Sequence, residues 1–408
     1  MPGWLQRHLP ALLLALALVP ALCDVVVNAY TGGRAWASLY YHIGYETGFG
    51  GRKLLGSICR LLFPDYITAR DIRLMVITAN LLVAALFVWL ADMAFRRSAD
   101  RNAPAMLLLL YLAGPFSLTA FMQSQLSVQF IEIYQILLTL GWLVMYVKWR
   151  GRWPFYAATL VVAVACCLLH HTFCNTLFPL YVSLFAYDAF SAGRLSLPKA
   201  LAYGSICAVL LALLVVVWKF STMNVDMETL RARMPERAAA DTYEWSPDAF
   251  HWLYYISNSD NRRLAMANMP LLMAQLAATL LIMSPLLALL LYPWVRAART
   301  ASQPAARWRY WLVLASVVLL TLPIFFMAND YGRWLTCWFF SLFAVLLVAW
   351  IDGDGPVSDA LRRMYAFFRR HWWVAAALLA YLVQFKVNGF EGLDWVLRMR
   401  DFLLAAIG

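Results

Sequence analysis

The feature that most constrains the fold is a series of long apolar stretches, separated by polar loops, that runs from one end of the chain to the other. An apolar run of about 18 residues is long enough to cross the hydrocarbon core of a bilayer as a helix. Such stretches lie near residues 9–28, 74–95, 104–122, 127–147, 155–170, 172–191, 200–219, 269–292, 309–328, 334–351 and 372–389. Hydrophobic residues make up 63% of the chain and charged residues only 13%, too few to cover a water-soluble fold. We therefore expect an all-α, polytopic membrane helix bundle with about eleven transmembrane helices, because a helix satisfies its own backbone hydrogen bonds in lipid.

The chain is expected to form a single transmembrane domain over residues 1–408, since it shows no second soluble domain, low-complexity tract or internal repeat. The first stretch has some features of a signal peptide, with Arg7 before it and Ala21-Leu22-Cys23 near its end. Leu22 is too large for the position before a cleavage site, so residues 9–28 are expected to remain as the first span. The seven cysteines have no zinc-site spacing and no disulfide framework, so no metal ligand is predicted from them.

The positive charges predict the orientation of the bundle, because Lys and Arg concentrate in short cytoplasmic loops. With a cytoplasmic N-terminus, the long loops 29–73 and 220–268 lie outside and the inner loops are short and basic. The inner basic residues are then Arg96, Arg97, Arg101, Lys148, Arg150, Arg152, Arg194, Lys199, Arg296, Arg299, Arg307, Arg309, Arg362, Arg363, Arg369 and Arg370. We expect the protein to lie in a membrane with its N-terminus on the cytoplasmic side; the resemblance described below implies the inner membrane of a bacterium. The net charge of +11 then anchors the protein to the inner leaflet and gives no sign of nucleic-acid binding. The inner acids Asp92, Asp188, Asp352 and Asp354 are expected to balance this charge locally.

The first outer loop combines acidic, glycine-rich and basic segments. Asp24 lies at the outer end of the first span, where a carboxylate is costly unless it is paired or faces water. It is a candidate general base, with Glu46 as the second candidate; the alternative for Asp24 is a helix-end carboxylate solvated by the interface. Residues 53–63 have helical apolar spacing and a basic face, which predict an interfacial amphipathic helix. Arg52 and Lys53 at its start are suited to hold a phosphate; the alternative is contact with lipid headgroups.

The fourth span and the hairpin between the fifth and sixth spans carry polar side chains near the outer surface. Gln125, Gln129 and Glu132 follow the spacing of one helix face, which should face the bundle or a cavity. They are candidates for substrate contact or for interhelical hydrogen bonding. His170 and His171 are adjacent, so on a helix their side chains point about 100° apart and form a poor metal pair. We expect them to hydrogen-bond an anionic or hydroxylated ligand; the alternative is a pair of satisfied interfacial histidines.

Two further outer segments carry charge. Asp330 and Arg333 lie three residues apart before the tenth span, and the forked donors of an arginine suit a phosphate or carboxylate. The alternative is an ion pair that only closes the turn. The loop 220–268 interleaves carboxylates with Trp and Tyr, a pattern that suits sugar hydroxyls and sugar faces. Its acids Asp226 and Glu228 leave a divalent cation, Mg²⁺ or Mn²⁺, open as a cofactor, although a solvated acidic loop is the default interpretation.

The layout resembles that of GT-C-fold glycosyltransferases. The shared features are a cytoplasmic N-terminus, a carboxylate just after the first span, and long outer loops after the first and seventh spans. Segments 46–56 and 330–334 also resemble those of uncharacterised bacterial membrane proteins of the surface-polysaccharide type. The resemblance implies a polyprenyl-phosphate-linked sugar donor, with Asp24 deprotonating the acceptor hydroxyl and Arg333 or Arg52 neutralising the leaving phosphate. Three valines follow Asp24, so the paired-acid motif of better-known members is absent from the first loop.

The predicted function is that of a membrane glycosyltransferase that acts on a glycan, lipid or protein acceptor on the periplasmic side, in contact with membrane lipids. A related alternative is a polysaccharide polymerase or ligase that uses a polyprenyl-diphosphate glycan. The alternatives from other classes are a transporter or flippase of a lipid-linked saccharide, and an acyltransferase that uses His170 or His171. Transporters usually have polar groups near the bilayer midplane, whereas the polar groups here cluster towards one face, which favours chemistry at the surface.

Overall fold

The computed structural model describes residues 3–31, 35–97, 101–191, 195–234, 247–255, 258–327 and 330–388, with a few residues nearer the C-terminus. The described chain is helical, apart from a short antiparallel pairing of β1 (Val387–Asn388) with β2 (Gly392–Leu393). The prediction of an all-helical bundle is therefore confirmed.

Six helical segments in the described part of the chain are long and apolar enough to cross a membrane. They are α1 (Gly3–Thr31), α4 (Ala69–Arg97), α5 (Asn102–Ala113) with α6 (Leu118–Gln123), α12 (Leu197–Phe220), α18 (Pro304–Leu319) with η4 (Leu322–Phe326), and α19 (Tyr331–Ile351). The helices α16 (Met269–Ile282) and α17 (Ser284–Thr300) meet at a bend of 69° and form a seventh if the pair is one span. The chain thus has the architecture of a multi-pass membrane protein.

The other predicted spans also form helices, but these are shorter or carry more polar residues. They are α8 (Glu132–Trp149), α9 (Trp153–Leu169), α10 (Phe173–Thr176) with α11 (Phe178–Ala189), and α21 (Trp372–Leu382), which follows the amphipathic α20 (Gly355–Arg370). The count of eleven spans remains a prediction.

The centre of the bundle is α19, which packs against α4, α11 and α17. Every residue of α19 is buried, as expected of a helix that is apolar on all sides and surrounded by other helices. Its only charged residue, Arg333, lies in the first turn. The elements that meet around this first turn therefore define the environment of that charge.

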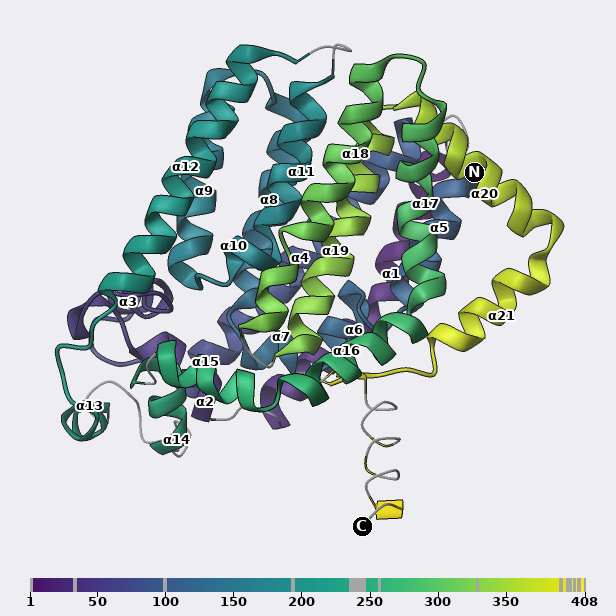
Figure 1. Cartoon of the computed structure of the whole chain (residues 1–408). Helices are drawn as coiled ribbons and strands as arrows, with labels where there is room; N and C mark the ends of the chain where they lie inside the picture. The colour runs from purple at the N-terminus through teal and green to yellow at the C-terminus, as the bar shows by residue number, and fades with distance from the viewer. Residues whose placement is uncertain are drawn as a thin grey trace.

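The two ends of the bundle differ in character (Figure 1). The N-terminus and the connections α8–α9, α17–α18 and α19–α20 lie at one end, which we call the N-terminal end. The helices of both long loops lie at the opposite end, which we call the loop end. The structure thus places the two long loops together and away from the N-terminus, and the orientation of these ends in the membrane remains a prediction.

The long loops fold together into a small cap over the loop end. The first loop supplies α2 (Ala35–His42), η1 (Tyr45–Thr47) and α3 (Leu54–Leu62); the second supplies α13 (Met227–Arg233), α14 (Pro247–Phe250), η3 (His251–Tyr255) and α15 (Asn258–Ala267). The cap has its own hydrophobic core, formed by Leu39, Ile43, Leu230, Met234, Ala249 and Phe250. The amphipathic helix predicted at 53–63 is present as α3; its location in the membrane surface remains a prediction.

Backbone hydrogen bonds join the two loops in an antiparallel arrangement. Thr222 N donates to Phe49 O at 2.8 Å, and Asn224 N donates to Thr47 O at 2.9 Å. Gly48 lies between these bonds with φ +125°, and a Cβ at this position would lie 2.4 Å from Thr222 O. Only glycine tolerates both the backbone conformation and the close approach. The glycines of the first loop are therefore explained in part by this junction.

Candidate functional site

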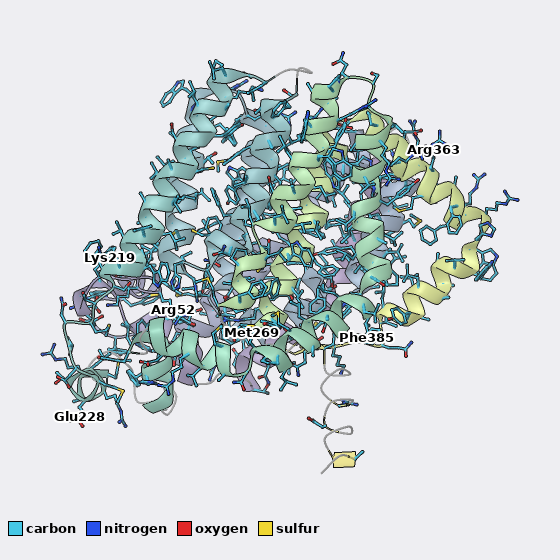
Figure 2. The ribbon with its side chains drawn as sticks, in the orientation of Figure 1. Arg52, Lys219, Glu228, Met269, Arg363 and Phe385 are labelled. Carbon is cyan, nitrogen blue, oxygen red and sulfur yellow. The ribbon has the colours of Figure 1, made fainter. Side chains whose placement is uncertain are left out.

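Several of the predicted site residues gather at the loop end. Figure 2 shows Arg52 at this end and Arg363, on α20, at the opposite end. The gathered residues come from the first loop, the start of α8, the α9–α10 turn and the start of α19. We call them the outer cluster: Arg52, Glu132, His170, His171, Asp330 and Arg333, together with Tyr40.

Arg333 is the buried charge at the centre of the outer cluster. Its Nη1 donates to Glu132 Oε1 at 3.0 Å, and its Nη2 donates to Asp330 Oδ2. The guanidinium lies 4.0 Å from the centroid of the Phe130 ring. Glu132 is 1% exposed and Arg333 4% exposed. Each keeps one buried polar atom without a hydrogen bond in the described part of the chain, namely Glu132 Oε2 and Arg333 Nε. The group therefore retains one acceptor and one donor for a ligand.

Arg52 reaches the outer cluster from the glycine-rich loop. Its φ is +70°, a left-handed conformation that non-glycine residues rarely adopt and that often marks a functional position. Its backbone N donates to Leu168 O at 3.1 Å, which fixes the loop to the end of α9. The side chain donates from Nε to His170 Nε2 at 3.0 Å and from Nη1 to Leu253 O at 3.0 Å. The strained backbone of Arg52 is thus accompanied by two side-chain hydrogen bonds that fix the direction of its guanidinium group.

His170 positions Arg52. His170 Nε2 accepts from Arg52 Nε, while Nδ1 lies 3.2 Å from the donor Thr172 N and 2.7 Å from Thr172 Oγ1. Both ring nitrogens are therefore occupied, and this arrangement leaves His170 no lone pair for a metal or a substrate proton. Gln135 Nε2 donates to His170 O at 2.8 Å and to Cys166 O at 2.9 Å, which satisfies carbonyls at the end of α9. Gln135 is thus a hydrogen-bonding support for this end of the site.

His171 packs beside the glycine-rich loop. A Cβ on Gly51 would lie 3.1 Å from His171 Nδ1, so glycine allows this contact. That Nδ1 is buried and has no hydrogen-bond partner among the described residues. Burial, assisted by the charge of Arg52, lowers the pKa of His171 to about 4. The ring is therefore neutral near pH 7 and offers a hydrogen bond rather than a positive charge.

Tyr40, on α2, is buried within the electrostatic influence of both arginines, and the sequence does not identify it as a site residue. Its side chain is buried, and burial raises its pKa, while the charges of Arg52 and Arg333 oppose that rise. Glu132 and Asp330 also act on the Tyr40 hydroxyl. The arginine of the first loop and the arginine of α19 therefore act on the same side chain. A tyrosine within a loop of many aromatics has no spacing that would have identified it from the sequence.

Three of the predicted site residues have other surroundings. Asp24 lies within α1, which continues beyond it to Thr31. It makes no hydrogen bond or ion pair with another residue that the structure describes. Glu46 accepts from Gly44 N at 3.2 Å and pairs with Arg60 Nη1 at 3.3 Å, within its own loop.

Lys53 holds the cap together rather than facing the outer cluster. Its Nζ donates to Thr222 O at 3.1 Å, and the side chain is buried. Burial lowers the pKa of Lys53 to about 8, against the opposing effect of Glu46. Lys53 therefore forms a second link between the two long loops, next to the backbone junction at Gly48.

The described residues contain no group of three or more His, Cys, Asp or Glu side chains that could hold a metal ion. Asp226, which was left open as a cation ligand, instead caps α13 by accepting from Thr229 N at 2.8 Å and from Thr229 Oγ1 at 2.7 Å. A divalent cation therefore has no set of protein ligands in this part of the chain.

The inner carboxylates pair with basic side chains, as predicted. Asp352 pairs with Arg150, Asp354 with Arg309 at 3.2 Å, Asp188 with Lys199 at 2.8 Å, and Asp92 with Arg96 at 2.8 Å. The prediction of local charge balancing at this end is confirmed.

Comparison with known proteins identifies no relative: no family model matches the chain, and no curated protein or solved structure matches it either.

Proposed function

We propose that the protein is a membrane glycosyltransferase that transfers a sugar from a polyprenyl-phosphate-linked donor to an acceptor at the outer face of the membrane. In this proposal the bundle has eleven spans in a GT-C-like layout, the loop end faces the periplasm of a bacterium, and the acceptor is a glycan, lipid or protein. The observation that carries the proposal is that α8 joins two arginines from separate parts of the chain: its Glu132 pairs with Arg333, and its Gln135 holds the carbonyl of His170, to which Arg52 is hydrogen-bonded.

The arginines have the chemistry that the departing group requires. When the bond between the sugar C1 and the phosphate oxygen breaks, that oxygen keeps the electron pair and the phosphate gains negative charge. Fixed guanidinium groups at this position stabilise the transition state without reorganisation. Arg333 offers Nε as a further donor, and the contact with His170 fixes the direction of Arg52. Donor binding would displace part of the pairing of Arg333 with Asp330, which is 25% exposed at its side chain.

Glu132 is the carboxylate best placed to accept the proton of the acceptor hydroxyl. Its Oε1 is held by Arg333, and its Oε2 has no partner in the described part of the chain. The acceptor oxygen forms the new bond to C1 while its proton passes to Oε2, and the phosphate leaves with the polyprenyl lipid. This assignment replaces Asp24 and Glu46 as general base, because Glu132 is the acid paired with Arg333, whereas Glu46 pairs with Arg60 of its own loop and Asp24 lies within α1.

A second candidate within this class is a polymerase or ligase that uses a polyprenyl-diphosphate glycan. The presence of two arginines favours it, because a diphosphate carries more charge and more acceptor oxygens than a monophosphate. A transporter is less well supported, since α19, the central helix, carries no charged residue beyond its first turn.

The test is transfer of a labelled sugar by purified protein from polyprenyl-phosphate and polyprenyl-diphosphate donors. Arg52→Lys and Arg333→Lys retain the charge but lose the planar fork, so each is expected to lower kcat/KM at least tenfold. Arg70→Lys, an exposed arginine at the start of α4, is the matched control and should keep full activity. Transfer by both cluster variants at the wild-type rate would reject the proposed role, and the donor that supports transfer decides between the two candidates.

A further inference from the structure

A cavity of about 310 Å³ lies at the N-terminal end of the bundle, far from the outer cluster. Its walls come from the ends of α8, α11 and α19 and from the starts of α18 and α20. Its lining includes two arginines, two tyrosines and three acids: Arg150, Arg309, Tyr187, Tyr310, Asp188, Asp352 and Asp354. A cavity of about 300 Å³ or more is large enough for a small ligand or a headgroup. Nothing in the proposed transfer reaction uses this site.

The arginines of the cavity have hydrogen-bond donors to spare. Arg309 lies against the Tyr187 ring, 3.7 Å from its centroid, and forms an ion pair with Asp354 at 3.2 Å. It donates no hydrogen bond to any residue that the structure describes, and its Nε is buried without a partner. Arg150 donates one hydrogen bond, to Asp352. A buried donor without an acceptor is unfavourable, so Arg309 Nε favours a ligand rich in acceptor oxygens, and Arg150 lines the same cavity.

The central carboxylate of the cavity is already satisfied. Asp354 accepts from Tyr187 Oη at 3.1 Å, from Tyr310 Oη at 3.0 Å and from Val357 N at 3.1 Å. The last of these bonds caps α20, so Asp354 has a structural role at that helix start. A ligand that offers hydroxyls or a positive charge would therefore find few open acceptors on Asp354. Asp188 is likewise satisfied, since it accepts from Lys199 Nζ and from Tyr203 Oη, each at 2.8 Å. The unpartnered donor of Arg309 therefore favours an anion.

The depth of the cavity is indicated by tryptophans. Trp149 precedes Arg150 and Trp308 precedes Arg309, and both indoles are exposed, at 49% and 63%. Exposed tryptophans of membrane proteins concentrate at the level of the lipid headgroups. The two arginines, one residue further along the chain, thus lie at the depth of lipid phosphates.

We propose that this cavity binds a phosphoryl group, held by Arg150 and Arg309, at the cytoplasmic face. The depth of the site makes an anionic phospholipid the expected source, and free phosphate has the same chemistry. Such a site goes beyond the transfer activity and does not depend on it. It would fix the ends of five helices to the inner leaflet through one headgroup.

The cavity offers a variant that blocks it without removing a charge. Gly355 lines the cavity, and a Cβ at this position would meet no atom within 4 Å. Gly355→Leu therefore adds a large apolar side chain to the cavity wall without a clash at its Cβ, while both arginines remain. Gly204→Leu is the matched control, because Gly204 on α12 is equally open but does not line the cavity. Arg309→Lys is a second variant, which keeps the charge and removes the fork.

The experiment measures the melting temperature and ligand binding of the purified full chain in detergent with three probes. These are phosphatidylglycerol, inorganic phosphate, and a monogalactosyl diacylglycerol that has lipid tails but no phosphate. We expect phosphatidylglycerol to raise the melting temperature of the wild type and of Gly204→Leu. Its dissociation constant should be at least tenfold higher for Gly355→Leu and for Arg309→Lys.

The responses to the three probes distinguish a phospholipid headgroup from free phosphate as the source of the phosphoryl group. Stabilisation by inorganic phosphate as well as by phosphatidylglycerol supports a phosphoryl site open to soluble ligands, and stabilisation by phosphatidylglycerol alone supports a headgroup site. Equal stabilisation by the galactolipid would overturn the proposal, because the tails alone would then account for it. Wild-type affinity in Gly355→Leu would also overturn it, whether or not Arg309→Lys folds.

Discussion

The ion pair between Arg333 and Glu132 makes a quantitative prediction about stability. Arg333 Nη1 and Glu132 Oε1 are 3.0 Å apart and both side chains are nearly inaccessible, so their attraction is about 5 kcal/mol at an effective dielectric constant of about 20. Desolvation offsets much of this gain, so the pair as a whole is close to neutral. Removal of one partner leaves an uncompensated buried charge, which costs about 3–5 kcal/mol.

The surroundings predict an asymmetry between the two single variants. Arg333→Leu leaves Glu132 buried without a cation, so it should reach the upper part of that range. Glu132→Leu leaves Arg333 in contact with Asp330, so its cost should lie at the lower end. The double variant should recover most of the wild-type stability, because leucines at both positions leave no buried charge from this pair.

The assay is reversible unfolding of the four proteins in detergent, analysed as a double-mutant cycle. We expect a coupling free energy of at least about 2 kcal/mol. Additive single effects would refute the reasoning, because they would show that the two side chains do not compensate each other. A double variant that is stable but inactive in transfer would separate the catalytic role of the pair from its structural role.

The remaining predictions concern the cap and the orientation of the bundle. Gly48→Ala should destabilise the protein by more than about 1 kcal/mol, measured by thermal melting, because alanine disfavours the positive φ and its Cβ collides with Thr222 O; wild-type stability would contradict the proposed junction. Because burial lowers the pKa of Lys53 to about 8 from 10.5, the folded protein loses this proton at lower pH than the unfolded chain does. The stability of the wild type relative to Lys53→Met should therefore rise as the pH increases from about 8 to about 10.5, and a flat or falling difference in melting temperature would disprove the assignment. An impermeant maleimide applied to intact cells should label Glu228→Cys, on α13, and spare Arg362→Cys, on α20. Labelling of Arg362→Cys alone would indicate that the bundle has the opposite orientation in the membrane.

Local patterns were sufficient to predict the helices. An apolar run is contained within one segment, so the sequence predicts helices at α4, α12 and α19 without knowledge of their neighbours. The helix α1 ends at Thr31, a few residues beyond the end predicted for the first span near residue 28. The apolar residues Val25, Val26 and Val27 extend the helix beyond Asp24.

The contacts of the site depend on the tertiary fold, and local patterns do not specify them. Arg52 and His170 are separated by 118 positions, and their hydrogen bond depends on how the first loop meets the α9–α10 turn. Glu46 has the chemistry of a general base, but its ion pair with Arg60 forms only when the loop folds back on α3. Tyr40 becomes a candidate only after both arginines have been placed beside it. The charged and polar residue types in the sequence thus identified candidate site residues, and the tertiary fold determines which of these side chains contact each other.

The most direct measurement of the central claim is an experimental structure of the protein with polyprenyl phosphate bound. The account predicts the phosphate within about 4 Å of the guanidinium groups of both Arg52 and Arg333, at hydrogen-bond or ion-pair distance. It also predicts that Glu132 Oε2 faces the space beside the phosphate. A phosphate held instead at the opposite end of the bundle, by Arg150 and Arg309 alone, would contradict the assignment of the outer cluster as the transfer site.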